Sequence, residues 1–101
     1  MTELRVDSTM EFEWNAVKAA ANKAKHGVSF QNAADALRDR KIVEELDIES
    51  DYGEERIIGY CLLEGQVLVV VYTLRDERYR IISARKADRH EQDYYYSENR
   101  T

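Results

Sequence analysis

The sequence predicts a single α+β domain, residues 1–101, in which helices pack on one face of an antiparallel sheet. Two segments, residues 15–27 and 29–40, repeat apolar residues at the helical spacing i, i+3, i+4 and i+7. Residues 56–85 instead contain three β-rich apolar runs separated by short polar turns. The 101 residues include no proline, so the chain can bury one modest core and shows no sign of an interdomain linker.

The N-terminal segment is predicted to form one strand and then a helix. Residues 1–9 are polar and are expected to be frayed. "MEFEW" (10–14) alternates apolar and acidic side chains, which is typical of a short half-buried strand. Asn15 is a favourable N-cap for the helix that follows, and Gly27 can adopt the left-handed conformation that ends it. The expected apolar face of this helix consists of Val17, Ala20, Ala21 and Ala24.

A second helix is predicted directly after the first. Ser29 is another favourable N-cap. The expected apolar face consists of Phe30, Ala33, Ala34 and Leu37. Because only Gly27 and Val28 separate the two helices, we expect a tight corner with His26 at its vertex.

The second half of the chain is predicted to be mostly sheet. The expected strands are residues 41–46, 56–63, 66–74 and 79–85. A polar loop precedes the second of them, with a turn at Gly53. Residues 86–96 are predicted to form a last helix with Asp88 as a possible cap, and residues 97–101 are expected to be frayed. The predicted order is therefore β-α-α-β-β-β-β-α, with four to five strands.

Composition excludes several classes of protein. No apolar run approaches 18 residues, and the start lacks the apolar region of a secretory signal, so we expect no membrane span and a cytoplasmic protein. The single cysteine, Cys61, allows no internal disulfide and suits a reducing compartment. One cysteine and two histidines, His26 and His90, cannot make a tetrahedral zinc site within one chain. We expect no metal ion and no cofactor.

The net charge of −5 hides an uneven distribution. Residues 44–55 hold seven acidic side chains and no basic one, and the rest of the chain has a net charge of +2. A local anion site is therefore possible on an acidic protein, although charge runs are usually solvated faces.

Several motifs together resemble one family. The segments "FEWNAVKAAANKAKHGVSFQNAADAL", "GEERIIGY", "VLVVVYT" and "RYRIISARKA" closely resemble the BrnT family, the toxin half of a bacterial type II toxin–antitoxin pair. The resemblance runs from about Phe12 to about Tyr94. It implies a RelE-like fold and a metal-independent endoribonuclease that forms a cyclic phosphate and inhibits translation. It also implies neutralisation by a BrnA-like antitoxin with a ribbon-helix-helix domain, through which the pair would reach operator DNA.

His26 and Lys25 are the first candidates for a catalytic site. The unperturbed pKa of histidine lies near neutrality, which suits an acid–base group, and the resembling motif carries "KHG" whole. The alternative is a histidine that hydrogen-bonds the last carbonyls of the helix. Lys25 could contact a phosphate or simply be a solvated helix lysine.

The remaining candidates are cations and a serine in the sheet and last helix. Arg56, Arg80 and Arg85 are candidates for a phosphate clamp, because the planar fork of arginine binds two oxygens. Arg80 is favoured as the catalytic one because it matches the motif of the resembling family near the start of its strand. The candidates for RNA or phosphate binding are Arg56, Ser83, Arg85 and Arg89. Strand alternation places Arg80 and Arg85 on opposite faces unless a bulge intervenes. Arg56 could instead pair with the neighbouring Glu54 or Glu55, and Ser83 could bond the backbone.

The last helix departs from the family pattern. Members usually end in a strongly basic helix, whereas residues 86–101 here carry three Lys or Arg and four Asp or Glu. This departure supports an alternative function, a catalytically weakened subunit that binds the antitoxin and acts as co-repressor. The three tyrosines at 94–96 could stack on bases, but packing of one or two on the sheet is the simpler interpretation.

Overall fold

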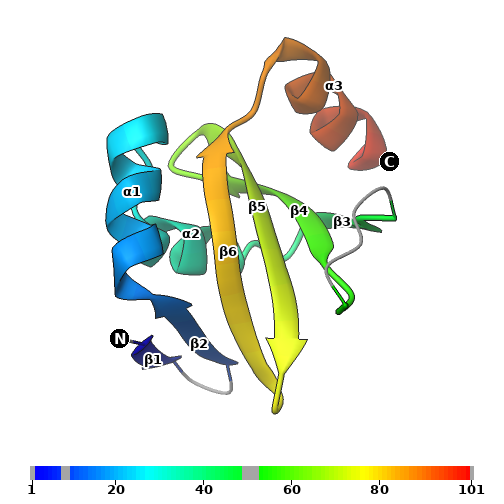
Figure 1. Cartoon of the computed structure of the whole chain (residues 1–101). Coiled ribbons are helices and arrows are strands. Elements are labelled where there is room, and N and C mark those ends of the chain that lie inside the picture. Colours follow the sequence, from blue (N-terminus) through cyan, green and yellow to red (C-terminus); the bar gives the residue numbers. More distant parts are fainter. Residues whose placement is uncertain (1, 8–9, 49–52, 101) are drawn as a thin grey trace.

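The structure is a computed structural model that describes residues 2–7, 10–48 and 53–100. Among these residues the strands form one sheet in the order β1-β2-β6-β5-β4-β3 (Figure 1). The elements are β1 (Thr2–Asp7), β2 (Met10–Asn15), α1 (Ala16–His26), α2 (Phe30–Ala36), β3 (Val43–Leu46), β4 (Ile57–Leu63), β5 (Gln66–Arg75), β6 (Arg78–Lys86) and α3 (Arg89–Glu98). The predicted α+β class is confirmed.

The sheet has six strands and is mixed, which corrects the prediction of four to five antiparallel strands. The extra strand is β1, which pairs antiparallel with β2 along its whole length. Residues 2–7 were expected to be frayed because they are polar, but an edge strand tolerates polar side chains on both faces. The sheet is mixed because β2 pairs in parallel with β6. The expected frayed positions 1, 8–9 and 101, and part of the acidic loop, 49–52, lie outside the described residues.

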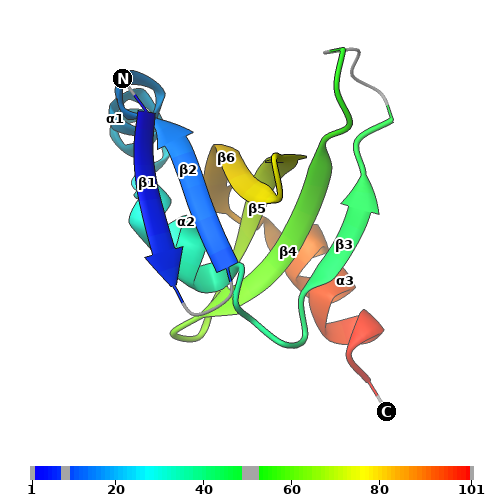
Figure 2. The same cartoon turned by 90° about the horizontal axis from the view of Figure 1, so that it is seen from below.

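Helices cover both faces of the sheet, not one as predicted. Leu68 and Val70 of β5 belong to the main core with α2, whereas Val67 and Val69 pack with Tyr95 of α3. Because alternate residues of a strand point to opposite faces, α1 and α2 lie on one face and α3 on the other (Figures 1 and 2). We call these the α1/α2 face and the α3 face. The continuous apolar run of β5 is the sequence mark of a strand buried on both sides.

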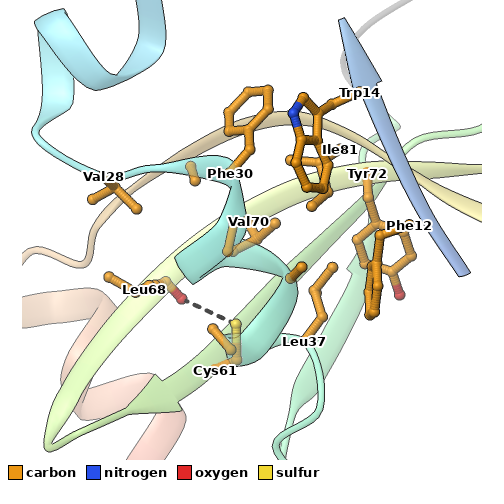
Figure 3. Close-up of a cluster of buried hydrophobic side chains, with 14 residues drawn as sticks. Phe12, Trp14, Val28, Phe30, Leu37, Cys61, Leu68, Val70, Tyr72 and Ile81 are labelled. Carbon is orange, nitrogen blue, oxygen red and sulfur yellow. Dashed lines mark hydrogen bonds between the residues drawn. The ribbon is translucent and has the colours of Figure 1, made fainter. Parts of the chain in front are cut away.

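The main core lies between the sheet and the two N-terminal helices (Figure 3). Phe12 and Phe30 are fully buried there, and Trp14 packs edge-on against Phe30. Cys61 is also fully buried, with its sulfur 3.7 Å from the carbonyl oxygen of Leu68. Burial raises the pKa of the Cys61 thiol to about 12, so the thiol stays protonated and unreactive at neutral pH.

The predicted corner between the first two helices is confirmed. The Asn15 side chain accepts hydrogen bonds from the backbone N–H groups of Val17 and Lys18, both at 3.0 Å. Gly27 ends α1 with a φ of 73°, in the left-handed region. Ser29 Oγ then accepts from the backbone N–H of Asn32 at 3.0 Å and caps α2.

The predicted buried face of α1 is wrong. Val17 is 73% exposed, and no residue of this helix is fully buried. The half-buried side instead carries Ala19, Asn22 and His26. Asn22 fixes this orientation, because its amide nitrogen donates to the carbonyl of Ala84 at 2.8 Å and its oxygen accepts from the backbone N–H of Ala84 at 3.2 Å.

The second and third helices follow the prediction with shifted ends. The apolar face of α2 is buried as predicted, but the helix ends at Ala36 and continues as turns. Asp88 caps α3 in a reciprocal pair with Glu91, so Lys86 belongs to β6. Residues 97 and 98, expected to be frayed, form the last turn of α3. Among the described residues, no helix combines the length and apolarity that a membrane crossing requires.

The three consecutive tyrosines have different environments. Tyr95 is 2% exposed and its hydroxyl donates to Asp39 at 2.6 Å. Tyr94 packs edge-on against Tyr60, with ring centroids 5.0 Å apart, whereas Tyr96 is 48% exposed. The simpler interpretation, packing on the sheet, is confirmed for Tyr94 and Tyr95.

Candidate functional site

A surface pocket of about 230 Å³ is lined by residues from the start of α1, the first half of β6, the end of β5 and the segment that precedes β4. Four cationic side chains line it, which are Lys18, Arg56, Arg75 and Arg80. Glu54 and Asn15 also contribute to its wall. We call this site the cation pocket. A concave site with several converging cations is suited to an anion such as a phosphate.

Arg80 is the most firmly held of these cations. It lies opposite Glu13 in the parallel pairing of β2 with β6. Its guanidinium donates to the Glu13 carboxylate at 2.5 Å, and the side chains of Arg80 and Glu13 are 19% and 11% exposed. Such a partly buried ion pair restricts the guanidinium to one orientation at the edge of the pocket.

A β-bulge in β6 answers the question of which arginines share a face. Ser83 pairs with Val71 of β5, and Ile81 pairs with Tyr72, so Ile82 is an extra residue. Ile81 and Ala84 therefore both face the main core although they are three residues apart. The alternation is shifted by one residue, which places Arg80, Ser83 and Arg85 together on the α3 face.

Arg85 shares that face but is already engaged. Its guanidinium donates two hydrogen bonds of 2.7 Å to the two carboxylate oxygens of Glu91. These bonds lower the pKa of the Glu91 carboxyl and raise the pKa of Arg85. The contact links β6 to the first turn of α3, and these two charged hydrogen bonds help to hold the helix against the sheet.

Arg56 and Arg75 share one carboxylate. Arg75 donates to Glu54 at 3.0 Å, and Arg56 Nε lies 3.6 Å from the other oxygen of Glu54. The ion-pair interpretation of Arg56 is thus confirmed, and the same side chain also lines the cation pocket. Arg89 lies elsewhere, on the exposed side of α3, where it pairs with Asp93 at 3.2 Å.

His26 and Lys25 lie at the opposite end of α1 from the cation pocket. The helix runs from Ala16 to His26, and a helix of this length spans about 15 Å. The structure therefore does not bring His26 and Arg80 together. His26 is half-buried, and no hydrogen bond or ion pair of its imidazole occurs within residues 2–7, 10–48 and 53–100. The alternative of a hydrogen bond from His26 to the last carbonyls of the helix is therefore not seen within the described residues.

Sequence reasoning missed Lys18 and Arg75 of the cation pocket, and Glu13, the partner of Arg80. Lys18 is the third residue of α1, and from the sequence it looked like an ordinary surface lysine. Arg75 pairs with Arg78 at the end of the β5–β6 hairpin. The predicted strands alone would have placed Arg75 next to the hairpin turn. Glu13 was assigned only to the polar side of a strand, although an acidic residue on a strand next to a basic one is a signal for an ion pair.

Metal ligands are sparse in this part of the protein. Among the described residues, no three His, Cys, Asp or Glu side chains lie close enough together to hold a metal ion. The charged side chains that line the pocket are the four cations and the Glu54 carboxylate. Guanidinium groups can bind a phosphate through two oxygens, and a nearby carboxylate can accept a proton.

Comparison with known proteins identifies the family. The sequence model of a family described as "Ribonuclease toxin, BrnT, of type II toxin-antitoxin system" matches residues 14–91. No curated protein matches the chain. The matched segment includes all of the cation pocket and the corner between α1 and α2. The chain therefore belongs to the BrnT family of ribonuclease toxins of type II toxin–antitoxin systems.

Proposed function

We propose that this protein is a metal-independent endoribonuclease whose RNA site is the cation pocket. Support comes from the family of ribonuclease toxins and from one observation above all, the convergence of Lys18, Arg56, Arg75 and Arg80 on one hollow. The reaction would proceed by attack of the RNA 2′-hydroxyl on the adjacent phosphate. The 2′-hydroxyl would lose its proton as its oxygen bonds the phosphorus, and the bond to the 5′-oxygen would break. That oxygen would leave protonated, which gives a 2′,3′-cyclic phosphate and a 5′-hydroxyl.

In this proposal the cations act on the charge that develops during the reaction. Attack on the phosphate gathers negative charge on its non-bridging oxygens, and donors already aimed at that charge commonly supply the largest catalytic contribution. Arg80 is the best placed of them, because Glu13 holds it in one orientation. Glu54 now bonds Arg75 and lies near Arg56, so an RNA phosphate would displace this carboxylate when it binds.

The other candidates have more distant roles. We propose that Lys25 and His26 contact RNA at the far end of α1, a few nucleotides from the cleaved bond. Ser83 lies on the α3 face between Arg80 and Arg85 and could donate to a phosphate there. Arg85 would first have to leave Glu91. Arg89 is exposed and its pairing with Asp93 is weak, so it is free to contribute a peripheral phosphate contact.

The protein partner would be an antitoxin encoded beside this chain. We propose a BrnA-like antitoxin with a ribbon-helix-helix DNA-binding domain, and operator DNA would be reached only through that antitoxin. The toxin–antitoxin family supports the existence of the partner. The gene next to this chain provides the check, since it should encode a short protein of that type.

A second function has its own support. Three arginines of the cation pocket already have carboxylate partners, Arg80 with Glu13 and both Arg56 and Arg75 with Glu54. RNA must compete with these carboxylates, so catalysis could be weak. The protein would then act mainly as a subunit that binds the antitoxin and assists repression of its operon.

An RNA cleavage assay in EDTA tests the proposal. The purified chain, freed of antitoxin, is incubated with a structured RNA beside Arg80→Ala, His26→Ala and the control Arg100→Ala, which removes the same charge at the end of α3. We expect cleavage by the original protein and by Arg100→Ala, and a strong loss in Arg80→Ala. Cleavage that survives in Arg80→Ala would place the site elsewhere, and a loss in His26→Ala as strong as that expected for Arg80→Ala would move the site to the helix corner. No cleavage by well-folded protein would favour the binding subunit.

A further inference from the structure

The strand β3 forms one end of the sheet. It pairs with β4 on its inner side, and within the described part of the chain no strand pairs with its outer side (Figure 2). Its sequence, "VEEL", contains none of the lysine or proline residues that commonly protect an edge, and its pairing with β4 is regular. The outer side of β3 therefore offers backbone donors and acceptors to another strand.

Two hollows flank this edge strand, one on each face of the sheet. On the α3 face, a hollow of about 240 Å³ is lined by Glu45, Tyr60, His90, Glu91 and Tyr94. On the α1/α2 face, a hollow of about 260 Å³ is lined by Glu44, Glu45, Leu46 and Ile57. The register places them on opposite faces, because Glu45 pairs with Ile58 and the next residue, Leu46, pairs with Ile57.

The hollow on the α3 face is acidic and aromatic. Glu45 accepts from the Tyr60 hydroxyl at 2.8 Å and from the Tyr94 hydroxyl at 3.4 Å. Both of these partners are uncharged hydroxyl groups. A carboxylate beside two tyrosine rings is a favourable environment for a lysine or arginine side chain, through both ion pairing and cation–π attraction.

The hollow on the other face is more apolar. Leu46 is 56% exposed, and Ile48, just beyond the end of β3, is 85% exposed. Ile57 is partly buried and packs against the main core. Large exposed apolar side chains beside an open sheet edge are typical of a surface that binds a protein partner.

We propose that β3 is the docking edge for an extended segment of the antitoxin, which adds to the sheet as a further strand. Successive side chains of an added strand point alternately to the two faces, so this segment should alternate between Lys or Arg and apolar residues. The basic residues would enter the hollow at Glu45, and the apolar residues would cover Leu46 and Ile57. The proposal rests on the antitoxin partnership of the family and is independent of ribonuclease activity.

Charge favours this partner over a second copy of the chain. Two copies paired through β3 would bring the strand "VEEL" against itself, with Glu44 and Glu45 of one copy near those of the other. Like charges on adjacent strands destabilise the pairing, whereas a basic side chain on the α3 face would pair with the Glu45 carboxylate. The occupant should therefore be a basic segment.

The test uses this chain and the antitoxin encoded next to it. Calorimetric titration compares the original chain with Glu45→Lys, Leu46→Lys and the control Glu64→Lys, which makes the same charge change at the exposed β4–β5 turn. We expect each β3 variant to weaken binding about tenfold or more, as for loss of a central interface contact. The control should stay within about twofold. Hydrogen exchange at residues 43–46 should slow when the antitoxin is bound.

Several results would overturn the proposal. It fails if the antitoxin does not bind the original chain, or if both β3 variants bind normally while hydrogen exchange at residues 43–46 is unchanged. It also fails if the free chain dimerises in sedimentation experiments and Leu46→Lys abolishes the dimer, because the occupant is then a second copy. Cleavage of naked RNA by Glu45→Lys separates this test from the proposed function. Normal cleavage with lost antitoxin binding would support the docking edge alone.

Discussion

The cation pocket and the β3 edge contain charged groups of opposite sign, and their partners differ in kind. In the cation pocket, Arg80 pairs with Glu13 and Arg75 with Glu54, so positive charge is balanced by carboxylates. At the β3 edge, Glu45 bonds tyrosine hydroxyls, and Glu44 contacts the hydroxyl of Tyr72. Ion pairs orient the arginines for a ligand but compete with it, whereas neutral tyrosines orient a carboxylate and leave its charge unbalanced.

This difference explains how one small protein can face two kinds of partner. The net charge of −5 suggests repulsion of RNA, yet seven of the twenty acidic residues fall in the single stretch 44–55, which includes the two glutamates of β3. The tyrosines there respond to it. Burial, followed by the Glu45 carboxylate, raises the pKa of Tyr60 well above its usual value. The separation of charge along the sheet provides one region for an anionic ligand and another for a cationic one.

The largest expected effect concerns the cation pocket itself. Arg80→Ala should lower the rate of RNA cleavage about 100-fold, because removal of one fixed donor to a developing anion commonly costs that much. The measurement is the single-turnover rate in EDTA. As the counterpart at the other region, Glu45→Lys should leave the rate within about twofold. Equal losses in both variants would show that the two regions do not act separately.

The second prediction concerns the ion pair that orients Arg80. Glu13→Gln should lower the free energy of unfolding by about 3 kcal/mol, because it leaves a largely buried guanidinium without its carboxylate. Urea denaturation followed by circular dichroism measures the change. Glu11→Gln is the matched control, since the Glu11–Arg78 pair is exposed and its loss should leave the denaturation midpoint unchanged. An unchanged midpoint in Glu13→Gln would mean that Arg80 is solvated and not held.

The third prediction uses pH to examine the ion pair of Arg85 and Glu91, which ties α3 to β6 beside the hollow on the α3 face. The hydrogen bonds from Arg85 lower the folded-state pKa of Glu91, so the pair stabilises the fold above the unfolded-state pKa of the carboxyl. Glu91→Gln should therefore be less stable than the original protein above about pH 5. The difference should disappear as pH falls through the lowered pKa. A difference that persists at the lowest pH would show that the capping role of Glu91, and not its charge, dominates.

The smallest expected effect concerns the anchor of α3, which forms one wall of the acidic hollow. Tyr95→Phe removes the hydrogen bond to Asp39 and should cost about 1 kcal/mol of unfolding free energy. Tyr96→Phe, at an exposed position, should have no effect. Thermal denaturation distinguishes the two. If Tyr95→Phe also weakens antitoxin binding, then the position of α3 affects binding at the β3 edge.

Local features of the fold were predictable because their causes are local. The helix caps at Asn15, Ser29 and Asp88 were identified correctly, since each side chain bonds backbone groups within three residues. The turn at Glu64 and Gly65 was also predictable, because left-handed backbone conformations favour glycine. The burial of Phe30 and Leu37 followed from helical spacing with large side chains.

Other features escaped prediction because their causes lie far along the chain. The apolar face of α1 was assigned wrongly, since alanine side chains are tolerated on either side of a helix and Asn22 decides the orientation by bonding Ala84. The side of the sheet that α3 covers was also assigned wrongly. A continuous apolar run such as β5 shows that both faces are buried but not by what.

The sequence by itself determined the family, the α+β class, the caps and the basic character of the segments around Lys18 and Arg80. Only the tertiary structure decided which of these cations meet. The parallel pairing of β2 with β6 brought Glu13 to Arg80, and one extra residue at Ile82 placed Arg80 and Arg85 on one face. The tertiary structure also left His26 at the opposite end of α1 from the pocket residue Lys18. Strand register and helix orientation depend on contacts between distant segments, and no local pattern contains that information.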